Sequence, residues 1–242
     1  METKVLDHGF IKFVDSMPSF IEKKNDELTI ADAAIVQAAR VSYGKGLTEY
    51  ERDKKLINYL WKNEHTSPFE QVIVKFHISC PLFVARQWMR HRTASYNELS
   101  GRYSVIPDKW YIPLNARIQD EKNKQSSIPT SNSKKSKIMI EKMTNCCTQM
   151  YEIYKQLIEI GICREQARMI LPQNMYTEFY VTMSLRNWFH FLKLRLDKSA
   201  QYEIRVYAEA IFEMLQKITP IATNIFIKSL PFKIKKEEIQ SK

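Results

Sequence analysis

Residues 87–102 read Gln-Trp-Met-Arg-His-Arg-Thr-Ala-Ser-Tyr-Asn-Glu-Leu-Ser-Gly-Arg, and the interpretation of the whole chain starts from them. Lysine is about twice as common as arginine in the sequence, yet this stretch and Arg86 just before it contain four arginines and no lysine. A planar guanidinium binds phosphate or carboxylate oxygens in two places at once, whereas an ammonium is a point charge. A merely solvated basic face is the plain alternative. The interspersed Ser, Asn, Glu, His and Tyr favour an anion-binding site.

The length and composition are those of an ordinary globular protein. The chain has 242 residues, 44% hydrophobic and 26% charged, which is enough to bury a sizeable core. No change of composition divides it, so we expect a single domain over 1–242. Because there is no apolar signal region at the start and no run of about 20 apolar residues, we expect a cytoplasmic protein without a membrane partner.

The net charge of +10 implies anionic partners, but it does not choose between nucleic acid and small phosphorylated molecules. Much of the excess is lysine at 133–137 and 233–242, and we expect the latter to be a flexible tail. The four cysteines form no Cys-x-x-Cys pair and the five histidines are scattered. We therefore expect reduced thiols and no metal site.

Apolar spacing along the chain predicts the main elements. A strand or bent hairpin is expected at 5–14, with strands at 71–79 and 175–183. Thr29 with Asp32, and Thr48 with Glu51, resemble capping boxes that start a helix at 30–41 and a second one ending near Lys62. A helix is expected to begin at Pro81 and to end near His91. Further helices are predicted at 138–160, 164–171, 185–196 and 200–218.

Residues 117–137 are dominated by Lys, Ser and Asn, which predicts a mobile loop. Only five glycines are present, so there is neither a Gly-x-Gly-x-x-Gly turn nor a P-loop. Any bound dinucleotide must therefore be held by side chains rather than by a Rossmann loop.

Ser100, Gly101 and Arg102 form a candidate phosphate site. If the strip is extended, the first and third side chains point the same way, and the glycine allows close approach of a ligand to the backbone. Ser100 as a nucleophile is the alternative, but no histidine stands at a spacing that identifies its base. Glu98 is either an ion-pair partner of the arginines or an acceptor for a ribose hydroxyl or base edge, and both interpretations remain open.

A second group of basic residues lies in the C-terminal half. Arg186 and His190 are one helical turn apart and share a face. On pattern alone, His190 is favoured as a structural histidine. Glu203 and Arg205 are interpreted as ordinary solvated residues. The group consists of Arg164, Arg168, Arg186, His190 and Arg195.

The sequence Arg90-His91-Arg92, seven residues, then Ser100-Gly101-Arg102 resembles the Arg-His-Arg-x7-Ser-x-Arg signature of the flavin-dependent thymidylate synthases. The resemblance extends over roughly 30–113 and 160–228. It implies methylation of dUMP to dTMP, with methylenetetrahydrofolate as the carbon donor, FAD as the hydride carrier and NADPH as the reductant. It also implies a homotetramer with sites at subunit interfaces and an α+β fold unlike the Rossmann enzymes, with a mixed or antiparallel sheet flanked by long helices.

Site residues carried over from this resemblance fall into two overlapping sets. The residues expected to bind dUMP are Gln87, Trp88, Met89, Arg90, Glu98, Leu99, Ser100, Gly101, Arg102, Arg168 and Arg195. Those expected to hold FAD are His65, Ser67, Arg90, His91, Arg92, Glu98, Ser184, Leu185, Arg186 and His190. Arg195 is the implied catalytic residue, which polarises the uracil ring so that C5 becomes nucleophilic without a covalent enzyme adduct. His65 is expected near both flavin and folate.

Three positions depart from some members of that family, namely Ser184, His190 and Ser199, and they concern the flavin's adenine half and the folate side. Two rival functions are weighed. A basic RNA-binding module would use the aromatic and arginine side chains of 87–111, and its affinity would fall steeply with salt. A flavin- and folate-dependent methyltransferase acting on uracil in RNA is the second. The short arginine-rich strip fits a mononucleotide better than RNA.

Overall fold

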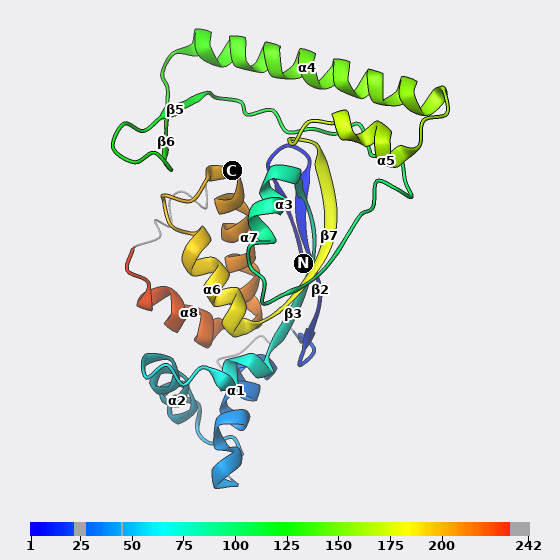
Figure 1. The fold of residues 1–242 in the computed structure, drawn as a ribbon. Coiled ribbons are helices and arrows are strands. Elements are labelled where there is room, and N and C mark those ends of the chain that lie inside the picture. Colours follow the sequence, from blue (N-terminus) through cyan, green and yellow to red (C-terminus); the bar gives the residue numbers. More distant parts are fainter. Residues whose placement is uncertain (22–27, 45, 233–242) are drawn as a thin grey trace.

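A five-stranded antiparallel sheet with the strand order β1-β2-β3-β7-β4 runs through the middle of the molecule (Figure 1). The structure, a computed structural model, describes residues 1–21, 28–44 and 46–232, so the expected tail at 233–242 lies outside the described residues. The strands are β1 (Glu2–Val5), β2 (Gly9–Met17), β3 (Ile73–Pro81), β7 (Tyr176–Ser184) and β4 (Ser95–Glu98). The α+β prediction is confirmed, and the sheet is antiparallel rather than mixed.

Strands β3 and β7 pair along their whole lengths and form the centre of the sheet. The alternation expected from the sequence is confirmed, because Val74, Phe76 and Ile78 are all fully buried on one face of β3. Strands β1 and β2 form the expected bent hairpin. The hydrophobic pattern thus fixes which face of the sheet meets the core.

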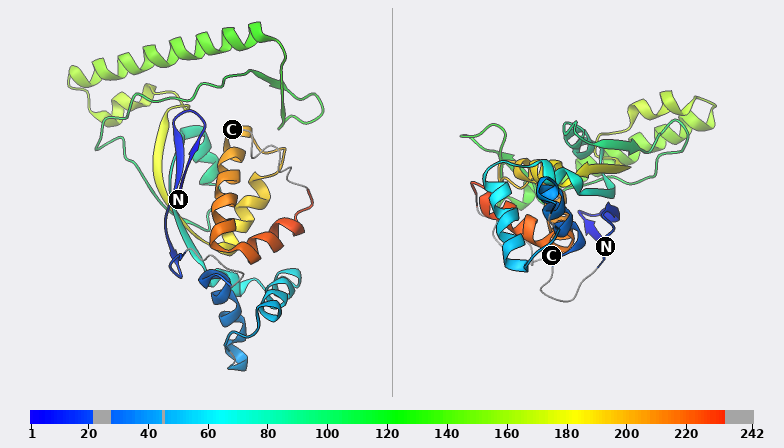
Figure 2. Two further views of the ribbon diagram at one scale, coloured as in Figure 1. Left: turned by 180° about the vertical axis from the view of Figure 1, so that it is seen from behind. Right: turned by 90° about the horizontal axis from the view of Figure 1, so that it is seen from below.

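Helices α3 (Leu82–Trp88), α6 (Leu185–Arg195) and α7 (Tyr202–Ile218) cover that face of the sheet (Figures 1 and 2). Helix α8 (Pro220–Ser229) packs against α7 and α2. Aromatic rings join them: Trp88 stacks on Phe191 with ring centroids 4.9 Å apart, and Phe189 on Phe226 at 4.4 Å. Helix α8 was not expected from the sequence. Within the described ranges no helix is long and apolar enough to cross a membrane.

Helices α1 (Ile30–Arg40) and α2 (Tyr50–Lys62) lie at one end of the sheet (Figure 1). The predicted cap of α1 is confirmed, since Thr29 Oγ1 accepts a hydrogen bond from the Asp32 N–H at 3.1 Å. The Asp32 carboxylate is fully buried and accepts hydrogen bonds from the backbone N–H groups of Ile221 and Ala222, each at 3.0 Å. A residue of α1 therefore caps the N-terminus of α8, which joins the two ends of the described chain.

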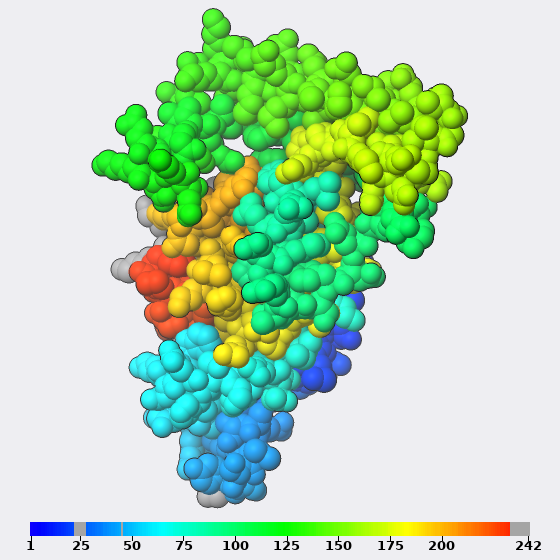
Figure 3. All heavy atoms as spheres, in the orientation of Figure 1, coloured from blue at the N-terminus to red at the C-terminus, as the bar shows by residue number. Residues whose placement is uncertain are grey.

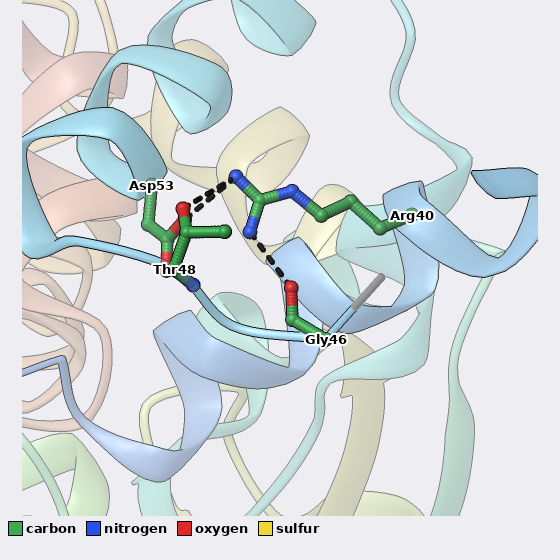
Figure 4. A network of polar contacts seen from close by, with 4 residues as sticks. All are labelled: Arg40, Gly46, Thr48 and Asp53. Carbon is green, nitrogen blue, oxygen red and sulfur yellow. Dashed lines mark hydrogen bonds and ion pairs between the residues drawn. The ribbon is translucent and has the colours of Figure 1, made fainter. Parts of the chain in front are cut away.

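The prediction that Thr48 and Glu51 form a capping box is wrong. The Thr48 hydroxyl instead donates to Asp53 at 2.6 Å, and Arg40 binds Thr48, Asp53 and the Gly46 carbonyl (Figure 4). Burial raises the pKa of Asp53, but the hydrogen bonds from Thr48 and the Arg40 guanidinium outweigh it and hold the pKa below its usual value. The buried Asp53 carboxylate and the Arg40 guanidinium thus bind Thr48, which the local pattern had placed at the start of the helix.

The loop expected at 117–137 is also corrected. It contains a small hairpin, β5 (Arg117–Gln119) with β6 (Ser127–Pro129), and the start of α4 (Ser133–Glu159). Ile118 and Ile128 face each other across the hairpin, and Asn132 Oδ1 accepts from the Lys135 N–H as a helix cap. The isoleucine pair and the asparagine cap are short patterns, and the many Lys and Ser residues around them favoured a loop in the sequence analysis.

Helix α4 thus starts five residues before the helix expected at 138–160, and it lies across the other end of the molecule (Figures 1 and 3). The short helix expected at 164–171 is α5 (Arg164–Ala167) followed by a 3₁₀ turn at Arg168–Ile170.

Gly9, at the start of β2, gives a first test of this packing. A Cβ atom there would lie 2.0 Å from the Tyr207 hydroxyl and 2.8 Å from the Ser79 carbonyl oxygen, two groups that hydrogen-bond each other. Because the clash separates a buried pair, we expect Gly9→Ala to lower the free energy of unfolding by about 2 kcal/mol in urea denaturation. Gly46→Ala is the control, since a Cβ at Gly46 meets nothing within 4 Å. Equal stability of the two variants would refute this account.

Candidate functional site

The chain leaves α3 at Trp88 and reaches β4 through an exposed turn. The Tyr96 hydroxyl holds this turn by donating to the carbonyl oxygens of Trp88 and His91, at 3.1 and 3.0 Å. The predicted end of the helix near His91 is confirmed. Arg90 and Arg92 are exposed on the turn, and neither has a side-chain hydrogen bond or ion pair within the described residues. Two guanidinium groups are therefore free to bind an anion.

Arg195 lies beside this turn at the end of α6. Its Nε donates to His91 Nε2 at 3.0 Å and one Nη donates to the Gln87 carbonyl oxygen at 3.2 Å. The His190 ring lies 6.2 Å from the His91 ring. We call Gln87, His91, His190 and Arg195 the Arg195 cluster. Among the described residues the second Nη of Arg195 has no partner, so the guanidinium is held on one side and open on the other.

His91 is neutral in this cluster. Burial, and then the charges of Arg195 and His190, lower the pKa of His91 to about 4. Because Nε2 accepts from Arg195, the ring proton must be on Nδ1. A neutral imidazole can therefore orient the Arg195 guanidinium without repelling it.

This lowered pKa predicts a pH effect on stability. Between pH 6.5 and about 4 the unfolded chain binds the His91 proton and the folded chain does not, so the stabilisation is complete above pH 6.5 and is lost as the pH falls. We expect urea unfolding at pH 7 and 4.5 to show a smaller loss of stability on acidification for His91→Phe than for the unchanged protein. Equal losses would contradict a neutral, buried His91.

A cleft of about 380 Å³ lies between β4, β7 and α5. Glu98, Leu99, Gly101 and Arg168 line it, and Glu98 Oε1 accepts from the Thr177 hydroxyl at 2.7 Å. We call it the Glu98 cleft. It combines a cation, a carboxylate and apolar walls, which is the composition of a small-molecule site.

Residues Ser100–Arg102 form a turn, so the condition of an extended strip is not met. The Ser100 hydroxyl accepts from the Arg102 N–H at 3.3 Å, and the Ser100 carbonyl oxygen accepts from the N–H groups of Tyr103 and Ser104 at 3.1 and 3.3 Å. Arg102 pairs with Glu165 at 3.3 Å, with both side chains exposed. A Cβ at Gly101 would lie 2.8 Å from Ile106 and 3.2 Å from the Arg168 side chain. The glycine is therefore needed for packing beside Arg168.

The residues expected to hold FAD include exposed side chains, a partner in an ion pair and a helix cap. His65 and Ser67 are exposed around the start of a 3₁₀ turn, and Arg186 binds Glu70 of that turn at 2.7 Å. Ser184 caps α6 by accepting from the Asn187 N–H at 3.4 Å.

Two of the predicted contact residues are buried. The side chains of Leu185 and Trp88 lie fully inside the core of this chain, so their contacts with flavin and dUMP stay predictions. Met89, between the core and the turn, is half-buried.

One chain does not bring all the predicted substrate residues into one pocket. Glu98, Leu99, Gly101 and Arg168 line the Glu98 cleft, whereas neither Gln87 nor Arg195 is among its lining residues. Arg90 lies on the exposed turn between them. Where the structure describes the chain, no group of three or more His, Cys, Asp or Glu side chains is arranged to hold a metal ion, and all four cysteines are unpaired.

Sequence reasoning missed the buried polar residues next to the Arg195 cluster. Glu203, interpreted as solvated, is 1% exposed and binds Tyr111 and Arg117. The signal was present in the helical spacing, because Glu203 is one turn before Tyr207 on the buried face of α7. Arg205 is half-buried and lies 3.8 Å from Glu209.

Comparison with known proteins gives consistent matches. Residues 26–221 match the family described as thymidylate synthase complementing protein. The chain is 48% identical over 229 residues to the flavin-dependent thymidylate synthase of Wolbachia pipientis wMel, covering 94% of this chain and 76% of that relative. It is 45% identical to the protein of the same name from Kosmotoga olearia, with 94% of each chain covered.

Among solved structures, the chain is similar to the UMP/dUMP methylase PolB from Streptomyces cacaoi. The structure of PolB bound with 5-Br dUMP has a TM-score of 0.79 and 28% identity, and the match covers 93% of this chain and 97% of that chain. The structure bound with 5-Br UMP has a TM-score of 0.80 at the same identity, and the match covers 96% of this chain and 99% of that chain.

Proposed function

The chain belongs to the family of flavin-dependent thymidylate synthases, and from this premise we propose that it methylates dUMP to dTMP, with methylenetetrahydrofolate as the carbon donor, FAD as the hydride carrier and NADPH as the reductant. The observation that carries the proposal is the Arg195 guanidinium, fixed by His91 and the Gln87 carbonyl with one Nη left open. That geometry suits a cation that acts on a substrate rather than one that only holds the fold.

Arg195 would act on the uracil ring. A fixed cation beside the ring carbonyl and N3 stabilises the negative charge that develops there as C5 becomes nucleophilic. Burial lowers the pKa of Arg195, and neutral His91 adds no competing charge. The residue therefore offers an electrophilic contact without a covalent enzyme adduct.

The dUMP phosphate would lie near the Glu98 cleft. Arg168 lines the cleft and Arg102 lies at its edge, paired with cleft residue Glu165. Forked guanidinium groups suit a dianionic phosphate. The Ser100 hydroxyl already accepts from the Arg102 N–H, and it has no histidine partner among the described residues, which favours phosphate binding over a nucleophilic role.

The exposed side chains around the turn fit a flavin dinucleotide. Arg90 and Arg92 supply unpaired cations for its phosphates, and Arg186, His65 and Ser67 would extend the same surface. When bound, reduced FAD supplies the hydride. His190, at the edge of the Arg195 cluster, would contact the flavin from the side of α6.

We further propose a homotetramer with shared sites. No residue of the Arg195 cluster lines the Glu98 cleft, which supports a second copy as the way to place both groups of residues against one nucleotide. This arrangement predicts that isolated monomers would bind dUMP poorly.

The proposal is tested with the purified protein under anaerobic conditions. We expect a yellow protein whose flavin bands shift on adding dUMP, and dTMP should form when methylenetetrahydrofolate and NADPH are present. UMP is the matched control, because the similar structures are of a UMP/dUMP methylase. Turnover of UMP in place of dUMP would redirect the assignment to a ribonucleotide. A colourless protein that FAD cannot reconstitute would refute it, and salt-sensitive binding that grows with RNA length would favour the RNA-binding rival.

A further inference from the structure

A chain of hydrogen bonds runs from the hairpin β5–β6 to the Arg195 cluster. Arg117 and the Tyr111 hydroxyl donate to Glu203 Oε1 at 2.5 and 3.1 Å. Gln201 Nε2 donates to Glu203 Oε2 at 2.9 Å, and Gln87 Nε2 donates to Gln201 Oε1 at 2.5 Å. The resemblance to thymidylate synthases assigns no role to Glu203 or Gln201.

Glu203 is the buried end of this series of hydrogen bonds, and its carboxylate can only accept them. Glu203 is 1% exposed, and an ionised carboxylate there requires a counter-charge, which Arg117 supplies. Burial, and then the charge of Glu203, raise the pKa of Tyr111, so the phenol keeps its proton and donates. Among the described residues, the three groups that hydrogen-bond to Glu203, from Tyr111, Arg117 and Gln201, are therefore donors.

Because Glu203 is a pure acceptor, it fixes which group donates and which accepts in each of the other hydrogen bonds of the series. Because Glu203 only accepts, Gln201 must turn its NH₂ group towards it and its carbonyl oxygen towards Gln87. Gln87 must then turn its own NH₂ group towards Gln201. The amide oxygen of Gln87 is left without a protein donor among the described residues, on a side chain that is only half-buried.

We propose that Glu203 and Gln201 are positioning residues that orient the Gln87 amide, so that its carbonyl oxygen accepts a hydrogen bond from the substrate nucleotide. This rests on the proposed function, since it takes Gln87 to bind dUMP. The matching donors of dUMP are the uracil N3–H and the 3′-hydroxyl, and the phosphate has none. A flipped amide would present NH₂ there and lose the contact.

Gln87 also connects its own side-chain amide to Arg195. The Gln87 backbone carbonyl accepts from Arg195 while its side chain is held by Gln201. Arg117 is also the first residue of β5, and its guanidinium lies 5.2 Å from the centre of the Tyr202 ring. The hairpin β5–β6 is thereby attached to the proposed substrate site through the ion pair of Arg117 with the buried Glu203.

The test compares Gln201→Met, Glu203→Gln and the double variant as FAD-loaded proteins. Dissociation constants for dUMP come from the shift of the flavin bands and from calorimetry, with flavin content and thermal unfolding measured alongside. We expect each single change to raise the dissociation constant about tenfold, as for one lost hydrogen bond, and the double variant to lose no more than either. Flavin content should stay unchanged.

Tyr111→Phe is the matched control, because it removes a donor to the same carboxylate without touching either amide. Its dissociation constant should stay within about twofold of the unchanged protein. Unchanged binding in Gln201→Met, additive losses in the double variant, or an equal loss in Tyr111→Phe would each overturn the inference. If the unchanged protein fails to bind dUMP, the proposed function fails instead.

Discussion

Replacing Arg195 with alanine is expected to lower the rate of dTMP formation at least about 100-fold while FAD stays bound, as for the loss of one preorganised donor to developing charge. The side chain is held by His91 and the Gln87 carbonyl and keeps one Nη open. None of the exposed groups assigned to the flavin depends on that contact, so the flavin absorbance per chain should be unchanged. Turnover is measured anaerobically with saturating dUMP.

Two variants make the Arg195 result specific. Arg195→Lys keeps the charge but cannot bind His91 and Gln87 together, so we expect it to remain far less active than the unchanged protein. Arg52→Ala removes an exposed arginine of α2 and should leave turnover unaltered. Loss of flavin in Arg195→Ala would show that the residue supports the cofactor rather than the uracil.

The second large effect is expected for Asp32→Ala. The change removes the side-chain acceptor of two buried N–H groups at the start of α8. Each unsatisfied buried donor is costly, so we expect a loss of about 3 kcal/mol in the free energy of unfolding by urea. Asp120→Ala is the control, because Asp120 accepts from backbone N–H groups only within an exposed turn.

The pH dependence of this loss has a defined sign. Burial raises the pKa of Asp32 to about 6, despite the hydrogen bonds that it accepts. Between pH 4 and 6 the folded protein therefore binds the proton more tightly than the unfolded chain, and stability from this group falls as the pH rises. The difference between the unchanged protein and Asp32→Ala should be larger at pH 5 than at pH 7. The opposite trend would mean that the hydrogen bonds dominate.

The fold could be predicted where a repeating pattern controls it. The period of two in β3, and the Thr29 cap of α1, are both confirmed. The failures have a common physical cause, which is tertiary contact. Thr48 was drawn to Asp53 instead of capping α2, and α8 is stabilised by an aspartate almost 190 residues earlier in the chain. A local pattern carries no information about such partners.

The site was predictable to the extent that unusual residue types mark it. The arginine excess located the exposed turn, and the resemblance supplied the pairing of Arg195 with that region, which the structure brings together through His91. Burial could not be read from the signature itself. Trp88 lies inside the same stretch but belongs to the core, and Glu203 looked like a surface residue although α7 turns it inward.

The pairing of β3 with β7 also sets when the site can exist during synthesis. The arginine-rich stretch lies in the long segment of chain that connects these two strands, and Arg195 follows β7. A ribosome exposes 87–102 first and needs roughly 5–20 seconds more to add the next 93 residues, up to Arg195. The stretch gains its sheet neighbour only when β7 has been made, and its contact with Arg195 only after that. Nucleotide binding at the proposed site therefore requires synthesis to have passed Arg195, and we expect shorter translation products to lack it.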